Sequence, residues 1–177
     1  MAPKTLLLAL MALTSVCLQA QQSHSANDWK DFDFVLGDWK WSGGGKPGEA
    51  NGVSTFRPDL QGTVLVRTNH LDYPATKERA AFSHDDLIYV YHDPQDKSLR
   101  AIYFDGEGHV IRYRVNVAPD KNSVEFLSDA APDGTTCRMT YRKVAADSVT
   151  ETFEIAPPGK PNEFARYVEF LAKRVSK

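Results

Sequence analysis

Alternation of apolar and polar residues with a period of two constrains this 177-residue chain more than any other feature of its sequence. The alternation is first clear at Trp39 and Trp41, which lie on one face of a strand because successive strand side chains point to opposite faces. Similar segments follow to the end of the chain, separated by turns rich in Asp, Gly, Pro and Asn. The predicted strands span residues 38–42, 53–56, 62–71, 86–92, 99–104, 109–117, 124–127, 135–144, 149–155 and 164–174.

This pattern predicts an all-β fold, an antiparallel up-and-down β-barrel of about ten strands. No helical period separates the strands, so a parallel sheet built from βαβ units is excluded. A sheet of about ten strands curls and closes, which removes its exposed edges. We expect one short helix over residues 27–36, ended by Gly37, and a single domain over residues 27–177.

The first 20 residues have the three-part layout of a secretory signal peptide. Lys4 supplies a positive charge, residues 5–16 form an apolar run too short to span a membrane, and Ala20 is a small residue at the expected cleavage point. Residues 21–26 are polar and are expected to form a flexible lead-in. The sequence therefore predicts a periplasmic or secreted protein.

Composition excludes several other classes. The chain has 21 Lys and Arg against 23 Asp and Glu, with no basic block, which argues against nucleic acid as a partner. Beyond the leader there is no apolar stretch of membrane length. Cys137 has no second cysteine after the leader, so the domain is not built on disulfides. Cys17 follows Val16 rather than a small residue, and we do not expect a lipid anchor there.

The alternating faces predict a barrel interior lined with aromatic rings among aliphatic side chains. Such a lining suits a small, mostly apolar or amphipathic ligand with a few polar atoms. The same rings could instead fill a narrow barrel completely. The expected ligand-binding aromatic residues are Trp39, Trp41, Tyr89, Tyr91, Tyr103 and Tyr113.

Two arginines of the last predicted strand lie on the face shared with Val168 and Phe170. In a ten-stranded antiparallel barrel the end of this strand lies beside the start of the first, so we expect Arg174 to stack on Trp39 and close that end of the barrel. Arg166 is expected nearer the opposite end, where it could meet a ligand carboxylate. A surface position or an internal pair with Glu151 is the alternative.

The segment Gly37-Asp38-Trp39, placed after a short helix and followed by a late arginine, resembles the Gly-x-Trp arrangement of the calycin superfamily. That superfamily includes lipocalins, fatty-acid-binding proteins and ten-stranded nitrobindin-like barrels. The wider pattern Phe32-x-Phe34-x-Leu36-Gly37-x-Trp39, with the hairpins Tyr91-His-Asp-Pro and Tyr103-Phe-Asp-x-Glu-Gly-His109, is similar to exported bacterial lipocalin-like proteins of unknown function. The resemblance implies a barrel with an internal cavity, in which Gly37, Trp39 and Arg174 form the closing motif.

The resemblance does not imply haem or any other cofactor here. Nitrobindins bind haem through a histidine late in the chain, whereas the last histidine of this sequence is His109. His84 and Asp86 share a face but could hold a metal only weakly, and we expect no metal site. The segment Gly43–Gly48 has the letters of a dinucleotide fingerprint but no following helix to receive a pyrophosphate.

Two function classes follow from the sequence. The first is a non-enzymatic binder of a small apolar or amphipathic molecule. The second is a small barrel enzyme of the isomerase or lyase type, which would use His109, a tyrosine and Arg166 in the cavity, since a histidine at a barrel mouth can act as a general base. A solid-cored envelope protein that acts through its loops is a third possibility.

Overall fold

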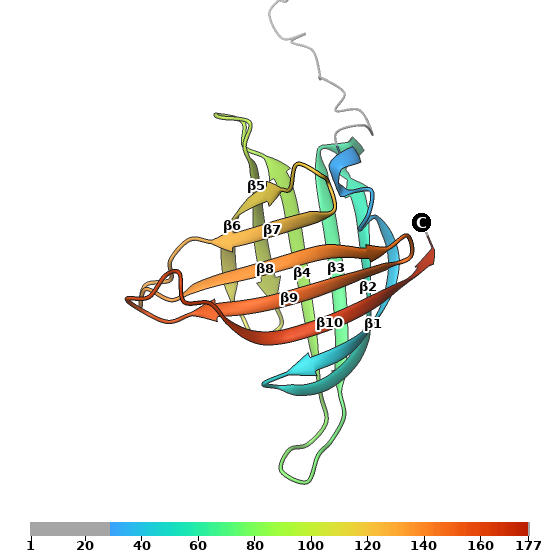
Figure 1. The fold of residues 1–177 in the computed structure, drawn as a ribbon, viewed down its shortest axis with the longest axis vertical. Coiled ribbons are helices and arrows are strands. Elements are labelled where there is room, and N and C mark those ends of the chain that lie inside the picture. Colours follow the sequence, from blue (N-terminus) through green and yellow to red (C-terminus); the bar gives the residue numbers. More distant parts are fainter. Residues whose placement is uncertain (1–28, 177) are drawn as a thin grey trace, which may run out of the picture.

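The chain forms a closed antiparallel barrel of ten strands in a computed structural model that describes residues 29–176 (Figure 1). Consecutive strands pair as neighbours, and β10 pairs with β1 to complete the ring. The strands are β1 (Gly37–Gly45), β2 (Gly48–Asp59), β3 (Val64–Tyr73), β4 (Phe82–His92), β5 (Leu99–Asp105), β6 (Val110–Val117), β7 (Ser123–Ser128), β8 (Thr136–Ala145), β9 (Ser148–Ala156) and β10 (Ala165–Ser176).

The predicted all-β barrel is therefore confirmed, and each predicted strand matches one strand of the structure. The predicted signal peptide, the lead-in and Cys17 lie outside the described residues. No helix in the part of the chain that the structure describes is long and apolar enough to cross a membrane.

The glycine-rich segment after Trp41 is the largest departure from the predicted boundaries. It was expected as a loop over residues 43–52, but β1 and β2 continue through it as a tight hairpin, with Gly45 paired to Gly48. A side chain at Gly45 or Gly52 would collide with the backbone of the adjoining strand, at Tyr167 and His70 respectively. The glycines therefore permit close strand packing rather than a loose loop.

The N-terminal turn is short and closes one end of the barrel. It is a 3-10 turn, η1 (Lys30–Phe32), shorter than the predicted helix. Three residues per turn place Trp29, Phe32 and Val35 on one face, and all three are fully buried. The Trp29 indole N–H donates to the carbonyl of Gly62 in a second 3-10 turn, η2 (Leu60–Gly62), at 2.8 Å.

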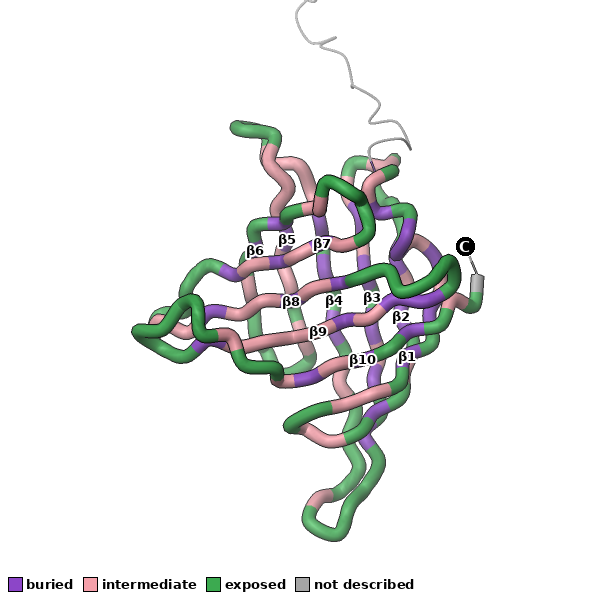
Figure 2. Tube along the Cα trace, in the orientation of Figure 1, coloured by how far each residue is buried: buried purple, intermediate pink, exposed green. Residues whose placement is uncertain are grey.

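The two ends of the barrel differ in how well they are sealed. We call the end beside η1, where β1 begins and β10 ends, the closed end (Figure 1). Burial is concentrated in the barrel wall, whereas the hairpin between β3 and β4 at the opposite end is largely exposed (Figure 2). We call that opposite end, where β4 begins and β5 ends, the open end.

Candidate functional site

Several inward-facing side chains near the open end are only partly buried. On β6, Val115 and Tyr113 are buried, whereas Ile111 toward the open end and Val117 toward the closed end are only partly buried. On β8, Tyr141 and Met139 are buried, whereas Cys137 is only partly buried. Because these residues face the same interior, solvent must reach the barrel from this end. The partly buried residues that pack against the core here are Tyr103, Ile111, Cys137, Phe153 and Tyr167, and we call them the mouth ring.

A buried polar cluster lies inside the barrel, and we call it the interior cluster. It consists of Arg67 and Asn69 on β3, Asp86 on β4 and Glu151 on β9. Arg67 Nη1 donates to Asp86 Oδ1 at 2.7 Å, and Arg67 Nη2 lies 3.3 Å from Glu151 Oε2. Asn69 Nδ2 donates to Asp86 Oδ2 at 2.8 Å. One guanidinium is thus shared by two carboxylates from different parts of the barrel wall.

The interior cluster is almost without solvent contact, and its charges act strongly on one another. The Arg67 side chain is only 3% exposed. Burial by itself lowers the pKa of Arg67, but Asp86 and Glu151 reverse this and keep the guanidinium charged. Burial raises the pKa of Glu151, and Arg67 offsets only part of that shift. By distance, Glu151 is the less closely paired of the two carboxylates, since Arg67 lies 3.3 Å from it and 2.7 Å from Asp86.

Two atoms of the interior cluster have no hydrogen-bond partner among the described residues: Arg67 Nε and Asn69 Oδ1. Both side chains are more than nine-tenths buried. Buried polar atoms in proteins are nearly always hydrogen-bonded, so an unpartnered donor and an unpartnered acceptor in one cluster call for a partner such as a water molecule or a ligand. The aromatic ring of Tyr141 lies 5.8 Å from the Arg67 guanidinium and forms part of the same environment.

A chain of hydrogen bonds leads from this cluster to the rim of the open end. His84 Nε2 lies 3.4 Å from Asp86 Oδ2 and 3.1 Å from the Tyr103 hydroxyl. Tyr103 donates to Asp105 Oδ2 at 3.2 Å, and His109 Nδ1 lies 2.8 Å from the same oxygen. The interior cluster is therefore linked to exposed groups through the half-buried His84.

His84 is held as an imidazolium by its surroundings. Its Nδ1 faces Glu107 Oε2 at 3.0 Å, and carboxylates cannot donate a proton in their ionised form. The hydrogen bond to Asp86, together with that to Glu107, raises the pKa of His84 to about 9 against the opposing effect of burial. At neutral pH this residue is a cation at the mouth of the barrel.

The same rim holds the one group among residues 29–176 with the spacing of a metal site. Ligand atoms of His84, Asp105 and Glu107 all lie within 4.8 Å of one another. An imidazole and two carboxylates suit a divalent transition metal. In the arrangement described, however, each of these groups already has partners, since His84 is bonded to Glu107 and Asp105 accepts from Tyr103 and His109.

Four of the six aromatic residues predicted as ligand-binding face the interior. Trp39, Trp41 and Tyr113 are buried, and Tyr103 belongs to the mouth ring. The interior position predicted for the other two, Tyr89 and Tyr91, is wrong. They lie on the outer face of β4; Tyr89 is 38% exposed and contacts Phe104 from outside, with ring centroids 6.4 Å apart.

The physical reason is the opposite parity of β4. Asp86, Ile88 and Val90 are the buried residues of this strand, which turns the tyrosines outward. Within the predicted strand 86–92, the face with Tyr89 and Tyr91 carries no charge, whereas the opposite face carries Asp86. The tyrosine face was therefore predicted to be the interior one. Asp86 is tolerated inside because Arg67 and Asn69 both bond to it.

The predicted interior position of Arg166 is also wrong. Its side chain is 63% exposed and pairs with Glu169 at 2.9 Å. A register shift between Arg166 and Val168 places an extra residue, Tyr167, in β10. Such a bulge reverses the inside and outside positions beyond it, so Arg166 faces outward while Tyr167 contacts Phe153 with ring centroids 6.2 Å apart.

His109, the candidate catalytic histidine, lies outside the barrel interior. It precedes β6, and its side chain is 68% exposed. It belongs to the turn between β5 and β6, where its backbone N–H and its ring both bond to Asp105. The structure therefore does not bring His109, an interior tyrosine and Arg166 together as one catalytic set.

The residues of the Gly-x-Trp motif lie at the closed end. The Arg174 guanidinium carbon lies 4.2 Å from the centre of the Trp39 ring, and Arg174 donates to the carbonyls of Phe34 and Leu36. The Trp39 indole N–H donates to Val35 at 2.7 Å. Gly37 has a φ of 109°, a backbone conformation that favours glycine, at the start of β1.

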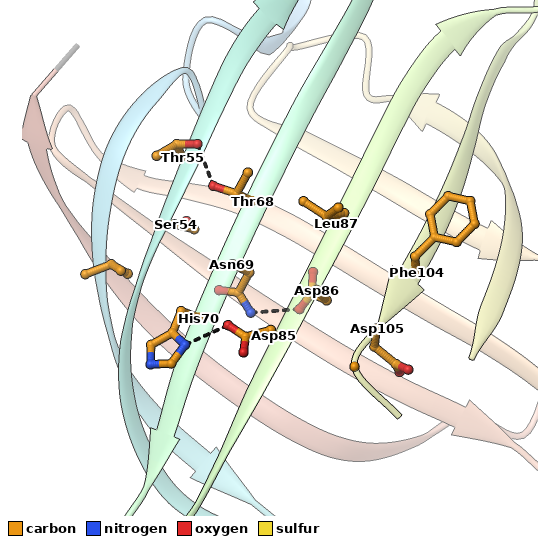
Figure 3. A pocket seen from close by; sticks show the side chains of 12 residues that line it. Ser54, Thr55, Thr68, Asn69, His70, Asp85, Asp86, Leu87, Phe104 and Asp105 are labelled. Carbon is orange, nitrogen blue, oxygen red and sulfur yellow. Dashed lines mark hydrogen bonds and ion pairs between the residues drawn. The ribbon is translucent and has the colours of Figure 1, made fainter. Parts of the chain in front are cut away.

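A separate hollow of about 450 Å³ opens on the outer face of strands β2 to β5 (Figure 3). Its outward-facing lining includes Thr55 bonded to Thr68, and His70 bonded to Asp85. Asn69 on β3 and Asp86 on β4, which are next to these paired residues in the sequence, also line it. The hollow is broad and exposed, and it adjoins the interior cluster, because Asn69 and Asp86 belong to both.

Sequence reasoning missed the interior cluster. Arg67, Asn69 and Asp86 were not predicted as site residues, and Glu151 was considered only as a partner for Arg166. One signal was present: Arg67 alternates with Leu65 and Leu71 at a spacing that puts a charge on an apolar strand face. Its partners come from strands far apart in the sequence, so the spacing along one strand could not reveal them.

Comparison with known proteins gives no family. No protein-family model matches the sequence, and no curated protein matches it.

Proposed function

We propose that this barrel binds a small amphipathic organic molecule through its open end and does not transform it. The polar part of the ligand meets the interior cluster, and its apolar part packs against the mouth ring. We further propose that the protein is a lipocalin-like member of the calycin superfamily and that it is exported after loss of residues 1–20. The layout of the predicted leader and the Gly37-Asp38-Trp39 motif support these two points.

The observation that carries this proposal is the pair of unpartnered buried atoms, Arg67 Nε and Asn69 Oδ1, beneath partly exposed aromatic residues. Ligand sites in proteins combine an apolar lining with a few well-placed polar groups. A barrel filled only for stability has no need of a buried charged cluster, because an apolar replacement of similar volume is usually as stable or more so. The cluster is therefore better explained by recognition than by packing.

Native mass spectrometry of the protein collected from a periplasm tests the proposal. We expect a discrete additional mass that disappears on unfolding, and its value identifies the ligand. A bare polypeptide mass, together with no saturable binding of any compound from a library of small amphipathic molecules, contradicts the proposal and favours a solid barrel.

A pair of neighbouring substitutions connects binding to the open end. Ile111→Trp places a large ring at the mouth, and we expect it to abolish ligand retention. Val110→Trp places the same ring one residue away on the outer face, where Val110 is 55% exposed, and we expect it to have no effect. Equal retention in both variants contradicts entry at this end.

An acid–base enzyme is the second candidate, and the position of His84 favours it over the predicted His109. His84 is half-buried at the mouth, within 3.1 Å of the Tyr103 hydroxyl. An imidazolium with a pKa of about 9 suits a proton donor. Conversion of the bound compound by the wild-type protein, abolished in His84→Gln, would replace the binding proposal with this one.

A further inference from the structure

Resting on the proposed interior binding function, we infer that the polar end of the ligand is a protonated amine and not a carboxylate. The charge balance inside the open end, its unused hydrogen-bond acceptors and its aromatic rings each favour an organic cation.

Acidic groups outnumber basic groups around the interior cluster. Asp86 and Glu151 lie inside the barrel, the Asp105 side chain is only 5% exposed, and Glu107 stands at the rim. Against these four carboxylates stand two half-buried or buried cations, Arg67 and His84, and the exposed His109, which contacts only Asp105 in this group. A ligand carboxylate would therefore approach more carboxylates than cations, which disfavours its binding.

Arg67 is not available as an anion receptor. Its two terminal nitrogens already bond to two carboxylates, Asp86 and Glu151, so the charge of the guanidinium is neutralised within the protein. Arginine recognises a carboxylate best through two parallel hydrogen bonds, but a third carboxylate on this guanidinium would add an unbalanced negative charge. Arg67 therefore differs from Arg166 as the sequence predicted it, since Arg166 was expected to offer an unpaired guanidinium to a ligand carboxylate.

Hydrogen-bond acceptors that can take a further donor are present beside Arg67. Asn69 Oδ1 has no donor among the described residues. Glu151 has a longer contact with Arg67, 3.3 Å, than Asp86 has, 2.7 Å, so its carboxylate is the less closely paired of the two. An ammonium group carries up to three donors and a positive charge, which meet both needs at once.

Aromatic rings complete the environment. Tyr141 lies under the Arg67 guanidinium, which shows that this part of the interior already accommodates a cation over a ring. Tyr113 is buried and contacts Phe126, which in turn contacts Tyr141, with ring centroids 6.1 and 5.9 Å apart. Cations bind favourably over the faces of tyrosine rings, and anions do not.

A head-group series tests the inference on the full-length protein exported to a periplasm and stripped of ligand. Three apolar groups (hexyl, dodecyl and 3-phenylpropyl) are each tested as the amine, the alcohol and the carboxylate. Binding is measured by isothermal titration calorimetry at about pH 7 and low salt. We expect amines to bind about tenfold tighter than the matching alcohols, and carboxylates to bind least. Tighter binding of a carboxylate or an alcohol overturns the amine inference and leaves the binding function standing. Saturable binding of none of the nine compounds overturns the amine inference, and the mass measurement then decides the fate of the binding function.

Matched substitutions on β9 assign the preference to the interior cluster. Glu151→Gln keeps the shape and removes the interior charge, and we expect amine affinity to fall about tenfold to that of the alcohol. Glu154→Gln makes the same change on the same strand, but Glu154 faces outward and pairs with Arg138, so we expect no change in binding. Loss of amine preference in both variants, or in neither, overturns the assignment.

A second variant keeps the inference testable if Glu151→Gln fails to fold. Asn69→Leu removes the unpartnered acceptor, together with the hydrogen bond to Asp86, without changing the charge of the site. We expect the amine preference to decrease about threefold while the carboxylates remain the weakest ligands. An unchanged head-group order and unchanged affinities would remove Asn69 from the site.

Discussion

The two ends of this barrel use the same ten strands for different purposes. At the closed end Trp29, Phe32, Val35 and Trp39 form an almost fully buried apolar group, and Trp39 is fixed by the carbonyl of Val35 and by Arg174. Toward the open end the interior contains charged groups, unpartnered atoms and half-exposed rings. We infer from this difference that stability is concentrated where η1 seals the barrel. The opposite end can therefore carry polar groups that would weaken a core.

The largest expected effect is at the closed end. Trp39→Ala leaves a cavity beneath Arg174 and removes the bond to Val35, and we expect a loss of about 4 kcal/mol in the free energy of unfolding. Urea denaturation followed by circular dichroism measures it. Val144→Ala is the control, because Val144 is 59% exposed and should change stability by less than about 0.5 kcal/mol. Similar losses in both variants would remove the distinction between sealed core and surface.

The next effect is at the open end and sharpens the contrast. Arg67→Met leaves two buried carboxylates without their cation, and we expect a loss of about 3 kcal/mol. Replacing Asp86 and Glu151 by Leu and Met in the same chain should restore most of that stability, because no buried charge remains unpaired. The same denaturation curves, with ligand titration, measure both. A triple variant that binds ligand normally would contradict the assigned role of the cluster.

A smaller effect compares the two arginines of β10. Arg174→Ala removes two hydrogen bonds and the stacking on Trp39, and we expect a loss of about 2 kcal/mol. Arg166→Ala removes an exposed pair with Glu169 and should cost less than about 0.5 kcal/mol. Thermal unfolding of the two variants in parallel gives the comparison. A greater loss for Arg166→Ala would mean that this residue faces the interior after all.

The smallest effect is the dependence of stability on pH at the open end. His84 has a pKa raised from 6.5 to about 9 by Asp86 and Glu107, so folding favours its protonated form. Its contribution is complete below pH 6.5 and is lost as the pH rises through 9, by about 1 kcal/mol once solvent screening of this half-buried group is allowed for. His84→Gln should flatten the stability curve in this window. An imidazole that titrates near 6.5 by NMR contradicts the arrangement.

Much of the fold could be predicted from the sequence, because strand period and turn residues act locally. The number of strands and their antiparallel order follow from residues such as Asp93-Pro94 and Asp105-Gly106 at the turns. Alternation alone does not say which of its two faces is the interior one. On β4 the aromatic face was predicted to be the interior one, but in the structure the face that carries Asp86 is buried instead.

The site was less predictable because its parts meet only in three dimensions. Arg67, Asp86 and Glu151 come from β3, β4 and β9. Each of them would destabilise the barrel interior as an unpaired buried charge if the other two were absent. The bulge at Tyr167 is set by the fit between β9 and β10, which no pattern within β10 reports. Sequence patterns therefore place strands well and buried charges poorly.

The seam between β1 and β10 has a consequence for how the barrel forms. Trp39 and Arg174 are partners across this seam, although they lie at opposite ends of the domain sequence. The ring cannot close until the last strand has been synthesised, so a ribosome-bound chain stays an open sheet with two unpaired edges. A protein truncated before β10 is accordingly expected to aggregate through β1 and β9 rather than to fold as a smaller barrel.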